Sequence, residues 1–148
     1  MTRIAILGPG DEAALEDVAP DVFDRPVRPE LAEEFLEDPR HHLAVAIDLG
    51  QVVGFASAVH YLHPDKPPEL WINEVGVAPT HRRRGLAKKL MRALFEVGHR
   101  LGCREAWVLT DRENGPASRL YASVSGVEAS PAAMFAFRLE EIGTEPGV

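Results

Sequence analysis

Three consecutive arginines, Arg82–Arg84, stand directly before Gly85 in a chain whose formal net charge is −7. Apolar residues then recur at helical spacing, at Leu86, Leu90, Leu94, Val97 and Leu101. A helix that begins here presents unpaired backbone N–H groups and the positive end of its dipole. Basic residues at that end oppose the dipole, so the pattern favours a bound anion over a solvated helix start. We therefore predict a phosphate or pyrophosphate site at this turn.

The elements that position this turn follow from hydrophobic periodicity and turn residues. Strands are expected over residues 2–7, 42–48, 51–61, 69–77, 104–110 and 132–139, and helices over residues 11–19, 30–38, 84–101 and 116–124. The order β-α-α-β-β-β-α-β-α-β places antiparallel hairpins first and a βαβ crossover second. It predicts an α/β fold whose mixed, mostly antiparallel central sheet carries helices on both faces. We expect one domain over residues 1–148.

Charge and composition limit the partners. Residues 1–40 hold eleven acidic and four basic residues, a balance of −7 that equals the net charge of the chain. This argues against nucleic acid or an anionic membrane as the main partner and favours a cationic one, unless the acidic residues only solubilise surface helices. No apolar run approaches the length of a membrane span. With the single cysteine Cys103 and no cysteine or carboxylate pattern beside the histidines, we expect a cytoplasmic protein without a metal site.

Glu74 is the second feature that could do chemistry. It lies in the predicted strand 69–77, where strict alternation would place Leu70, Ile72, Glu74 and Gly76 on one face. The other face would carry Trp71, Asn73, Val75 and Val77. A carboxylate within an apolar row is costly unless it has a partner or a role. The alternative is a carboxylate at a sheet edge that reaches water.

The segment VAPTHRRRGLA, residues 77–87, resembles the acetyl-CoA motif Q/R-x-x-G-x-G/A of the GCN5-related N-acetyltransferase (GNAT) superfamily. The segment NGPASRLYASVSG, residues 114–126, is similar to the second motif of that family, N-x-x-A-x-x-L-Y-x-x-x-G-F. It has one extra residue before Gly126, and Val127 stands where phenylalanine is usual. The strand order matches as well, so the resemblance extends over nearly the whole chain and implies an acetyl-CoA-dependent N-acetyltransferase with the GNAT fold.

The resemblance also assigns roles around coenzyme A (CoA). The backbone at the turn would hold the CoA pyrophosphate, and strand 69–77 would pair with the pantetheine arm and the acetyl carbonyl. Two residues of the second motif would line the opposite side of the CoA. The residues so assigned are Val75, Val77, Arg82, Arg83, Arg84, Gly85, Leu86, Ala87, Asn114 and Ala117.

Direct acetyl transfer to an amine requires a neutral amine, and deprotonating an alkyl ammonium at pH 7 costs about 4 kcal/mol. Glu74 is the candidate base that meets this need, directly or through water. Tyr121, at the tyrosine of the second motif, is the candidate acid that would protonate the leaving thiolate; its alternative is a core tyrosine with a satisfied hydroxyl. Cys103 shows no setting that lowers a thiol pKa, so a covalent intermediate is not expected.

For the acceptor, the segments ELWINEVGVAPTHRRRGLA and TDRENGPASRLY look most like the aminoglycoside 3-N-acetyltransferases of the GNAT type. Glu74 would then replace an aspartate, and Asp111 and Glu113 would bind substrate ammonium groups. The open alternatives are another small amine or polyamine, a protein N-terminus, and a non-catalytic acyl-CoA sensor. The apolar segment 132–139 could support a homodimer, although core packing would explain it equally well.

Overall fold

The computed structural model describes residues 1–129 and 132–143 and contains one mixed sheet of five strands. The strands lie in the order of the chain: β1 (Arg3–Leu7), β2 (His41–Asp48), β3 (Gln51–Tyr61), β4 (Glu69–Val77) and β5 (Ala106–Val108). The first four are antiparallel and β5 runs parallel to β4. The helices are α1 (Pro29–Glu37), α2 (Leu86–Arg100) and α3 (Gly115–Ser123), with 3-10 turns η1 (Glu12–Leu15) and η2 (Pro79–His81). The predicted mixed, mostly antiparallel sheet is confirmed.

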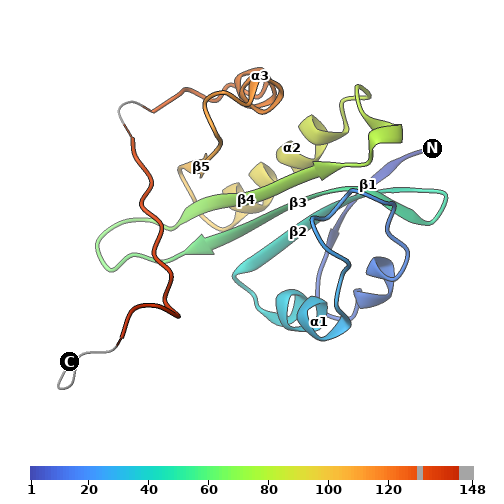
Figure 1. Ribbon diagram of the computed structural model, residues 1–148, viewed down its shortest axis with the longest axis horizontal. Coiled ribbons are helices and arrows are strands. Elements are labelled where there is room, and N and C mark those ends of the chain that lie inside the picture. Colours follow the sequence, from blue (N-terminus) through green and yellow to red (C-terminus); the bar gives the residue numbers. More distant parts are fainter. Residues whose placement is uncertain (130–131, 144–148) are drawn as a thin grey trace.

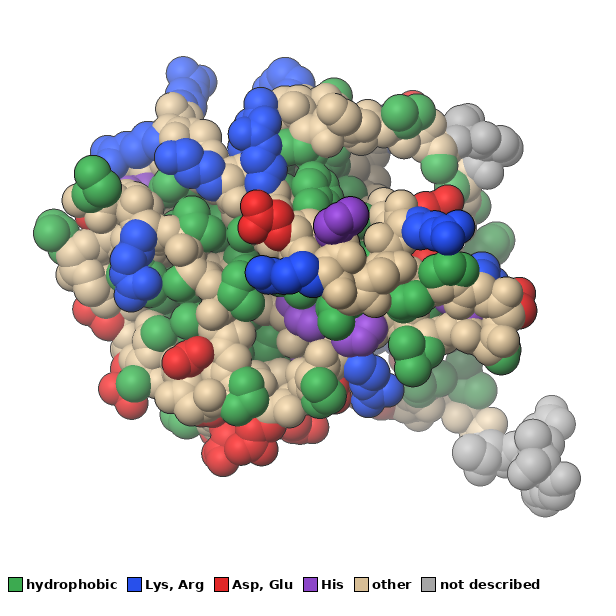
Figure 2. All heavy atoms as spheres, turned by 180° about the vertical axis from the view of Figure 1, so that it is seen from behind, with side chains coloured by type: hydrophobic (Ala, Val, Ile, Leu, Met, Phe, Trp, Pro, Cys, Tyr) green, Lys and Arg blue, Asp and Glu red, His purple; other side chains and the backbone are tan. Residues whose placement is uncertain are grey.

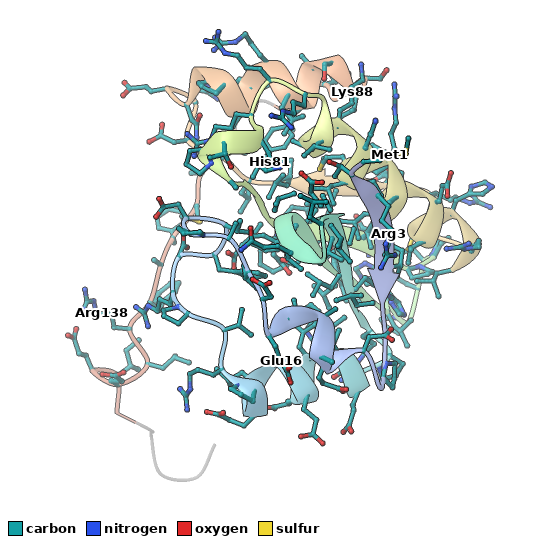
Figure 3. The ribbon with its side chains drawn as sticks, turned by 90° about the vertical axis from the view of Figure 1, so that its right-hand side faces the viewer. Met1, Arg3, Glu16, His81, Lys88 and Arg138 are labelled. Carbon is teal, nitrogen blue, oxygen red and sulfur yellow. The ribbon has the colours of Figure 1, made fainter. Side chains whose placement is uncertain are left out.

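Helices α1 and α2 lie on opposite faces of the sheet (Figures 1 and 3). The apolar stripe of α2 is buried against β3 and β4, and a Cβ on its Gly98 would lie 3.0 Å from the Leu70 side chain. The other face carries α1 and the loop before it, where Phe23 stacks on Phe55 with ring centroids 4.0 Å apart. Helix α1 and the loop before it cover this second face over β2 and β3, and they leave part of β4 and β5 accessible.

The predicted helix over residues 11–19 is wrong, because only the short 3-10 turn η1 forms there. The backbone after η1 is engaged by the sheet instead. Val52 N–H donates to the Asp17 carbonyl at 2.9 Å, and Ala19 N–H donates to the Val52 carbonyl at 2.8 Å. These bonds fix an extended bridge that a continued helix would exclude.

The predicted strand over residues 132–139 is also wrong. Residues 132–138 have no regular structure, and a turn follows, in which Glu141 N–H donates to the Arg138 carbonyl. Apolar composition favours extended backbone, but a strand also needs a neighbour, and β5 is the last strand of the sheet. The large apolar side chains of this segment are exposed: Met134 75%, Phe135 79%, Phe137 72% and Leu139 80%.

A β-bulge in β4 changes which face Glu74 occupies. Ser57 of β3 lies opposite Glu74, whereas the next residue, Ala58, lies opposite Ile72, so Asn73 is an extra residue in β4. Strict alternation is therefore the wrong description of this strand. Glu74 shares its face with Trp71, while Ile72 and Val75 face α2.

Two histidines of neighbouring strands form a stacked pair at one end of the sheet. His42 Nε2 lies 2.8 Å from His60 Nδ1, and the two rings stack with centroids 5.0 Å apart. Burial is the main cause that lowers the pKa of His42 to about 4, and the neighbouring His60 and His41 lower it further. The folded protein therefore keeps the His42 side chain neutral at a pH where the unfolded chain protonates it.

We expect the free energy of unfolding to fall as the pH is lowered from about 6.5 to about 4, because only the unfolded state binds this proton over that range. Urea denaturation at several pH values measures the effect. His42→Gln should make the dependence on pH shallower, whereas His99→Gln, at an exposed position of α2, should leave it unchanged. Identical slopes for wild type and His42→Gln would contradict the assignment.

Candidate active site

The turn between β4 and α2 leaves a helix start free to bind an anion. Gly85 caps α2 in the left-handed conformation, with φ of 73°, and makes no side-chain cap; among the described residues no side chain accepts from the first helical N–H groups. The first helical bond runs from Lys89 N–H to the Gly85 carbonyl, so the N–H groups of residues 86–88 have no helical acceptor. A Cβ on Gly85 would meet no atom within 4 Å. A phosphate can therefore approach the backbone closely.

Basic side chains surround this helix start. Arg82, Arg83 and Arg84 are all exposed, and the Arg82 Nε donates to the Val77 carbonyl at 3.4 Å. Arg83 adopts φ of 62°, which is uncommon for a residue with a side chain. Figure 2 shows basic side chains gathered at this end of the molecule and acidic ones at the opposite end, where α1 lies. Uncapped amides and positive charge together fit a pyrophosphate.

A contact that the sequence analysis did not identify holds the turn in place. His81 Nε2 lies 2.7 Å from Asp48 Oδ2, at the end of β2, and Thr80 Oγ1 lies 2.8 Å from His81 Nδ1. The hydrogen bond from His81 is the main cause that lowers the pKa of Asp48. His81 and Asp48 are 33 residues apart, so no local pattern could have indicated the pair. Figure 3 shows His81 at the same end of the molecule as Lys88 of α2.

Strand β4 has a free edge beside this turn. It pairs with β5 only from Leu70 to Ile72, opposite Ala106 to Val108. Within the described ranges no strand lies on that side of residues 73–77. The backbone of Val75 and Val77 therefore lies at an edge with room for an extended ligand, and its contact with a pantetheine arm, which the resemblance implies, stays a prediction.

Glu74 lies on the face of β4 opposite α2 and is exposed. In the part of the chain that the structure describes, its carboxylate has no hydrogen-bond or ion-pair partner. Beyond Glu74 the face closes, because a Cβ on Gly76 would come 2.3 Å from the Val22 carbonyl oxygen. Glu74 is thus a solvent-accessible carboxylate beside the free section of β4, which agrees with the alternative of an edge carboxylate that reaches water and not with a carboxylate inside an apolar row.

The loop after β5 follows the carboxyl end of that strand, and the turn follows the carboxyl end of β4. Because the two strands are parallel, both segments lie toward the same end of the sheet. Asp111 and Glu113 are both exposed there, and Asp111 Oδ1 accepts from the Glu113 N–H at 3.0 Å. Asn114 caps α3, because its Oδ1 accepts from the Ala117 N–H at 3.1 Å. This bond gives both residues of the second motif a structural role, and their predicted contact with CoA stays a prediction.

Tyr121 of α3 is half-buried and packs against the hydrophobic core. Burial raises the pKa of its phenol, which keeps the proton on the oxygen at neutral pH. The glycine of the second motif ends this helix: Gly126 N–H donates to the Tyr121 carbonyl at 2.9 Å, and a Cβ there would lie 2.8 Å from that oxygen. The predicted role of Tyr121 as an acid stays open.

Two further findings concern the described residues alone. They contain no group of three or more His, Cys, Asp or Glu side chains placed to hold a metal ion. None of their helices combines the length and the apolar character that crossing a membrane requires.

The chain is similar to known acetyltransferases. The model of a family described as the acetyltransferase (GNAT) family matches residues 12–126. An aminoglycoside N(6′)-acetyltransferase type 1 of Salmonella typhimurium is 32% identical over 109 residues, 70% of this chain and 73% of the relative. An L-2,4-diaminobutyric acid acetyltransferase of Oceanobacillus iheyensis is 35% identical over 75 residues, 51% of this chain and 40% of the relative.

Among solved structures, AAC(6′)-Iy in complex with the bisubstrate analogue CoA-S-monomethyl-acetylneamine superposes with a TM-score of 0.77 at 22% identity, covering 93% of this chain and 99% of that one. The aminoglycoside enzymes named here are of the 6′ type, so the expected 3-N specificity is not supported. The match over residues 12–126 and the free helix start agree with the predicted family. The chain belongs to the GNAT family and is an acetyl-CoA-dependent N-acetyltransferase.

Proposed function

We propose that this chain acetylates a primary amine of an aminoglycoside. The observation that carries the proposal is the position of Glu74, an accessible carboxylate on the open face of β4 beside the free edge of Asn73–Val77. An amine on that face would lie next to any thioester paired with the edge. The exposed carboxylates of Asp111 and Glu113 on the neighbouring loop and the similarity to an aminoglycoside N(6′)-acetyltransferase support a polycationic aminosugar as the acceptor.

When bound, acetyl-CoA supplies the acetyl group as a reactive thioester. The free N–H groups at the start of α2 and the arginines of the turn hold its pyrophosphate, and the backbone of Val75 and Val77 orients its arm. Glu74 accepts a proton from the acceptor ammonium, directly or through water. Tyr121 carries a phenolic proton at neutral pH and can donate it to a thiolate. Asp111 and Glu113, exposed on the neighbouring loop, attract further ammonium groups of the acceptor.

The regiochemistry of the proposal follows the named relatives, which are of the 6′ type. A 6′-amine stands on a methylene group, outside the sugar ring, and reaches a carboxylate on a sheet face with less steric hindrance than a ring amine does. We therefore propose the 6′-amine in place of the 3-amine.

Turnover with neamine, which carries both amines, tests this function. Purified protein is mixed with acetyl-CoA and neamine, release of the CoA thiol is followed, and the acetylated position is identified by NMR. We expect thiol release and 6′-N-acetylneamine. Turnover of L-2,4-diaminobutyrate or of a peptide N-terminus, with none of neamine, would favour the alternative acceptors. Binding of acetyl-CoA without thiol release in any of these mixtures would favour a sensor.

A further inference from the structure

Both tryptophans of the chain stand side by side on the sheet. Trp71 of β4 and Trp107 of β5 are directly paired residues, and their rings stack with centroids 4.8 Å apart and an interplanar angle of 12°. This separation equals the usual spacing of neighbouring strands, about 4.8 Å, so the two rings rise from the sheet as parallel plates. The Trp107 indole N–H donates to the Tyr61 hydroxyl at 2.8 Å, which fixes the orientation of the pair.

The bulge at Asn73 places this aromatic pair beside Glu74. Val59 lies opposite Trp71, and Ser57 lies opposite Glu74, so the two β4 side chains share one face and are separated by two positions of β3. Two positions correspond to about 7 Å along a strand. Without the bulge, residues three apart would point to opposite faces. The bulge therefore places the stacked rings of Trp71 and Trp107, which together with Tyr61 we call the wall, on the same face as the candidate base Glu74.

In the described structure the wall is only partly covered, and His63 packs edge-on against Tyr61 with ring centroids 5.0 Å apart. Trp71, Trp107 and Tyr61 are only half-buried, and α1 lies over β2 at the other side of this face (Figure 1). The C-terminal segment 132–139 crosses this side of the sheet in Figure 1, but its large apolar side chains are at least 72% exposed, so they do not pack on the indoles. Figure 3 shows Arg138 of that segment standing away from the sheet.

We propose that Trp71, Trp107 and Tyr61 form an acceptor subsite that binds the apolar face of a ring bearing amines and thereby selects cyclic amines over acyclic polyamines. The inference rests on the proposed function, since it concerns the acceptor of the same site. Its support is the continuity of the indole pair with Glu74 and the charge of that carboxylate. A ring lying against the indoles buries C–H surface, while an ammonium on the same ring reaches the carboxylate.

An acyclic polyamine cannot use the wall in this way. It offers the same ammonium groups but no rigid apolar face, and it loses chain entropy when it is ordered on a surface. Charge alone would therefore bind neamine and spermine, which carry equal numbers of amines, about equally. A preference for neamine has to come from apolar contact.

Intrinsic fluorescence reports on this subsite directly, because the chain has no tryptophan other than Trp71 and Trp107. With CoA present and no acetyl donor, neamine and spermine are titrated in turn and the emission is recorded. We expect neamine to change the emission with a Kd at least about tenfold lower than that of spermine. Equal affinities for the two amines would overturn the proposal.

Substitutions test whether the wall itself, and not an aromatic ring elsewhere in the protein, binds neamine. Trp107→Leu should weaken neamine about tenfold or more without changing the Kd of spermine or of CoA, and Trp107→Phe should restore most of the loss. Phe95→Leu, a half-buried ring on the α2 side, should change none of these values. Unchanged neamine binding by Trp107→Leu would overturn the subsite.

Two outcomes distinguish this inference from the proposed function. A fluorescence response to neamine without any acetylation would contradict the function and leave the subsite standing. Acetylation of neamine with a KM that Trp107→Leu does not change would contradict the subsite and leave the function standing. If Phe135→Ser shifts the emission without ligand, the C-terminal segment occupies the wall in solution, and the proposal is wrong.

Discussion

Replacing Gly85 by glutamate should abolish measurable binding of acetyl-CoA while leaving the protein folded. The new side chain would fill the open space in front of the free N–H groups of α2 and add a negative charge where a diphosphate is expected. Like charges about 4 Å apart near a protein surface repel by several kcal/mol, so the Kd should rise by at least about a hundredfold. Isothermal titration calorimetry with acetyl-CoA measures this change.

The control for this substitution is Gly102→Glu at the opposite end of α2. Gly102 has φ of 84°, close to the 73° of Gly85, and a Cβ there also meets nothing within 4 Å. Both variants therefore lose a similar stability, about 1–2 kcal/mol, from the left-handed backbone. Only Gly85→Glu should lose the ligand. Equal affinities of the two variants for acetyl-CoA would show that the pyrophosphate binds elsewhere.

The turn could be predicted from the sequence because its signals are local. A strand end, a proline, a basic run and a glycine stand within nine residues, from Val77 to Gly85, and each has a direct backbone consequence. The structure adds what is not local. The contact between His81 and Asp48 joins residues of different elements, and the free edge of β4 exists because β5 stops at Val108. Neither feature leaves a pattern in a short window.

Two of the three wrong structural predictions, the alternation in β4 and the strand over residues 132–139, have a common physical origin. The alternation around Glu74 failed because one inserted residue in a strand moves every later side chain to the other face, and Asn73 gives no signal of a bulge. The strand over residues 132–139 failed because extended backbone needs a neighbour and no described strand lies beyond β5. Local preference indicates which conformation is favourable, whereas pairing decides whether that conformation forms.

Glu74→Gln should lower kcat at neutral pH by about a hundredfold or more, with little change in the Kd of acetyl-CoA. The amide keeps the size of the side chain and loses its ability to accept the proton. Without a base, the reaction depends on the small fraction of acceptor amine that is already neutral. Deprotonating the acceptor ammonium costs about 4 kcal/mol at pH 7. Steady-state kinetics with neamine, together with calorimetry for acetyl-CoA, separates the two effects.

The pH profile gives the sharper test of the same substitution. If Glu74 is the base, the activity of Glu74→Gln should rise about tenfold per pH unit toward the pKa of the acceptor amine, whereas the wild-type activity levels off earlier. Glu96→Gln, at an exposed position of α2, removes a carboxylate far from the free edge of β4 and should follow the wild type. Parallel profiles for wild type and Glu74→Gln would remove Glu74 from the proton transfer and direct attention to the loop that carries Asp111.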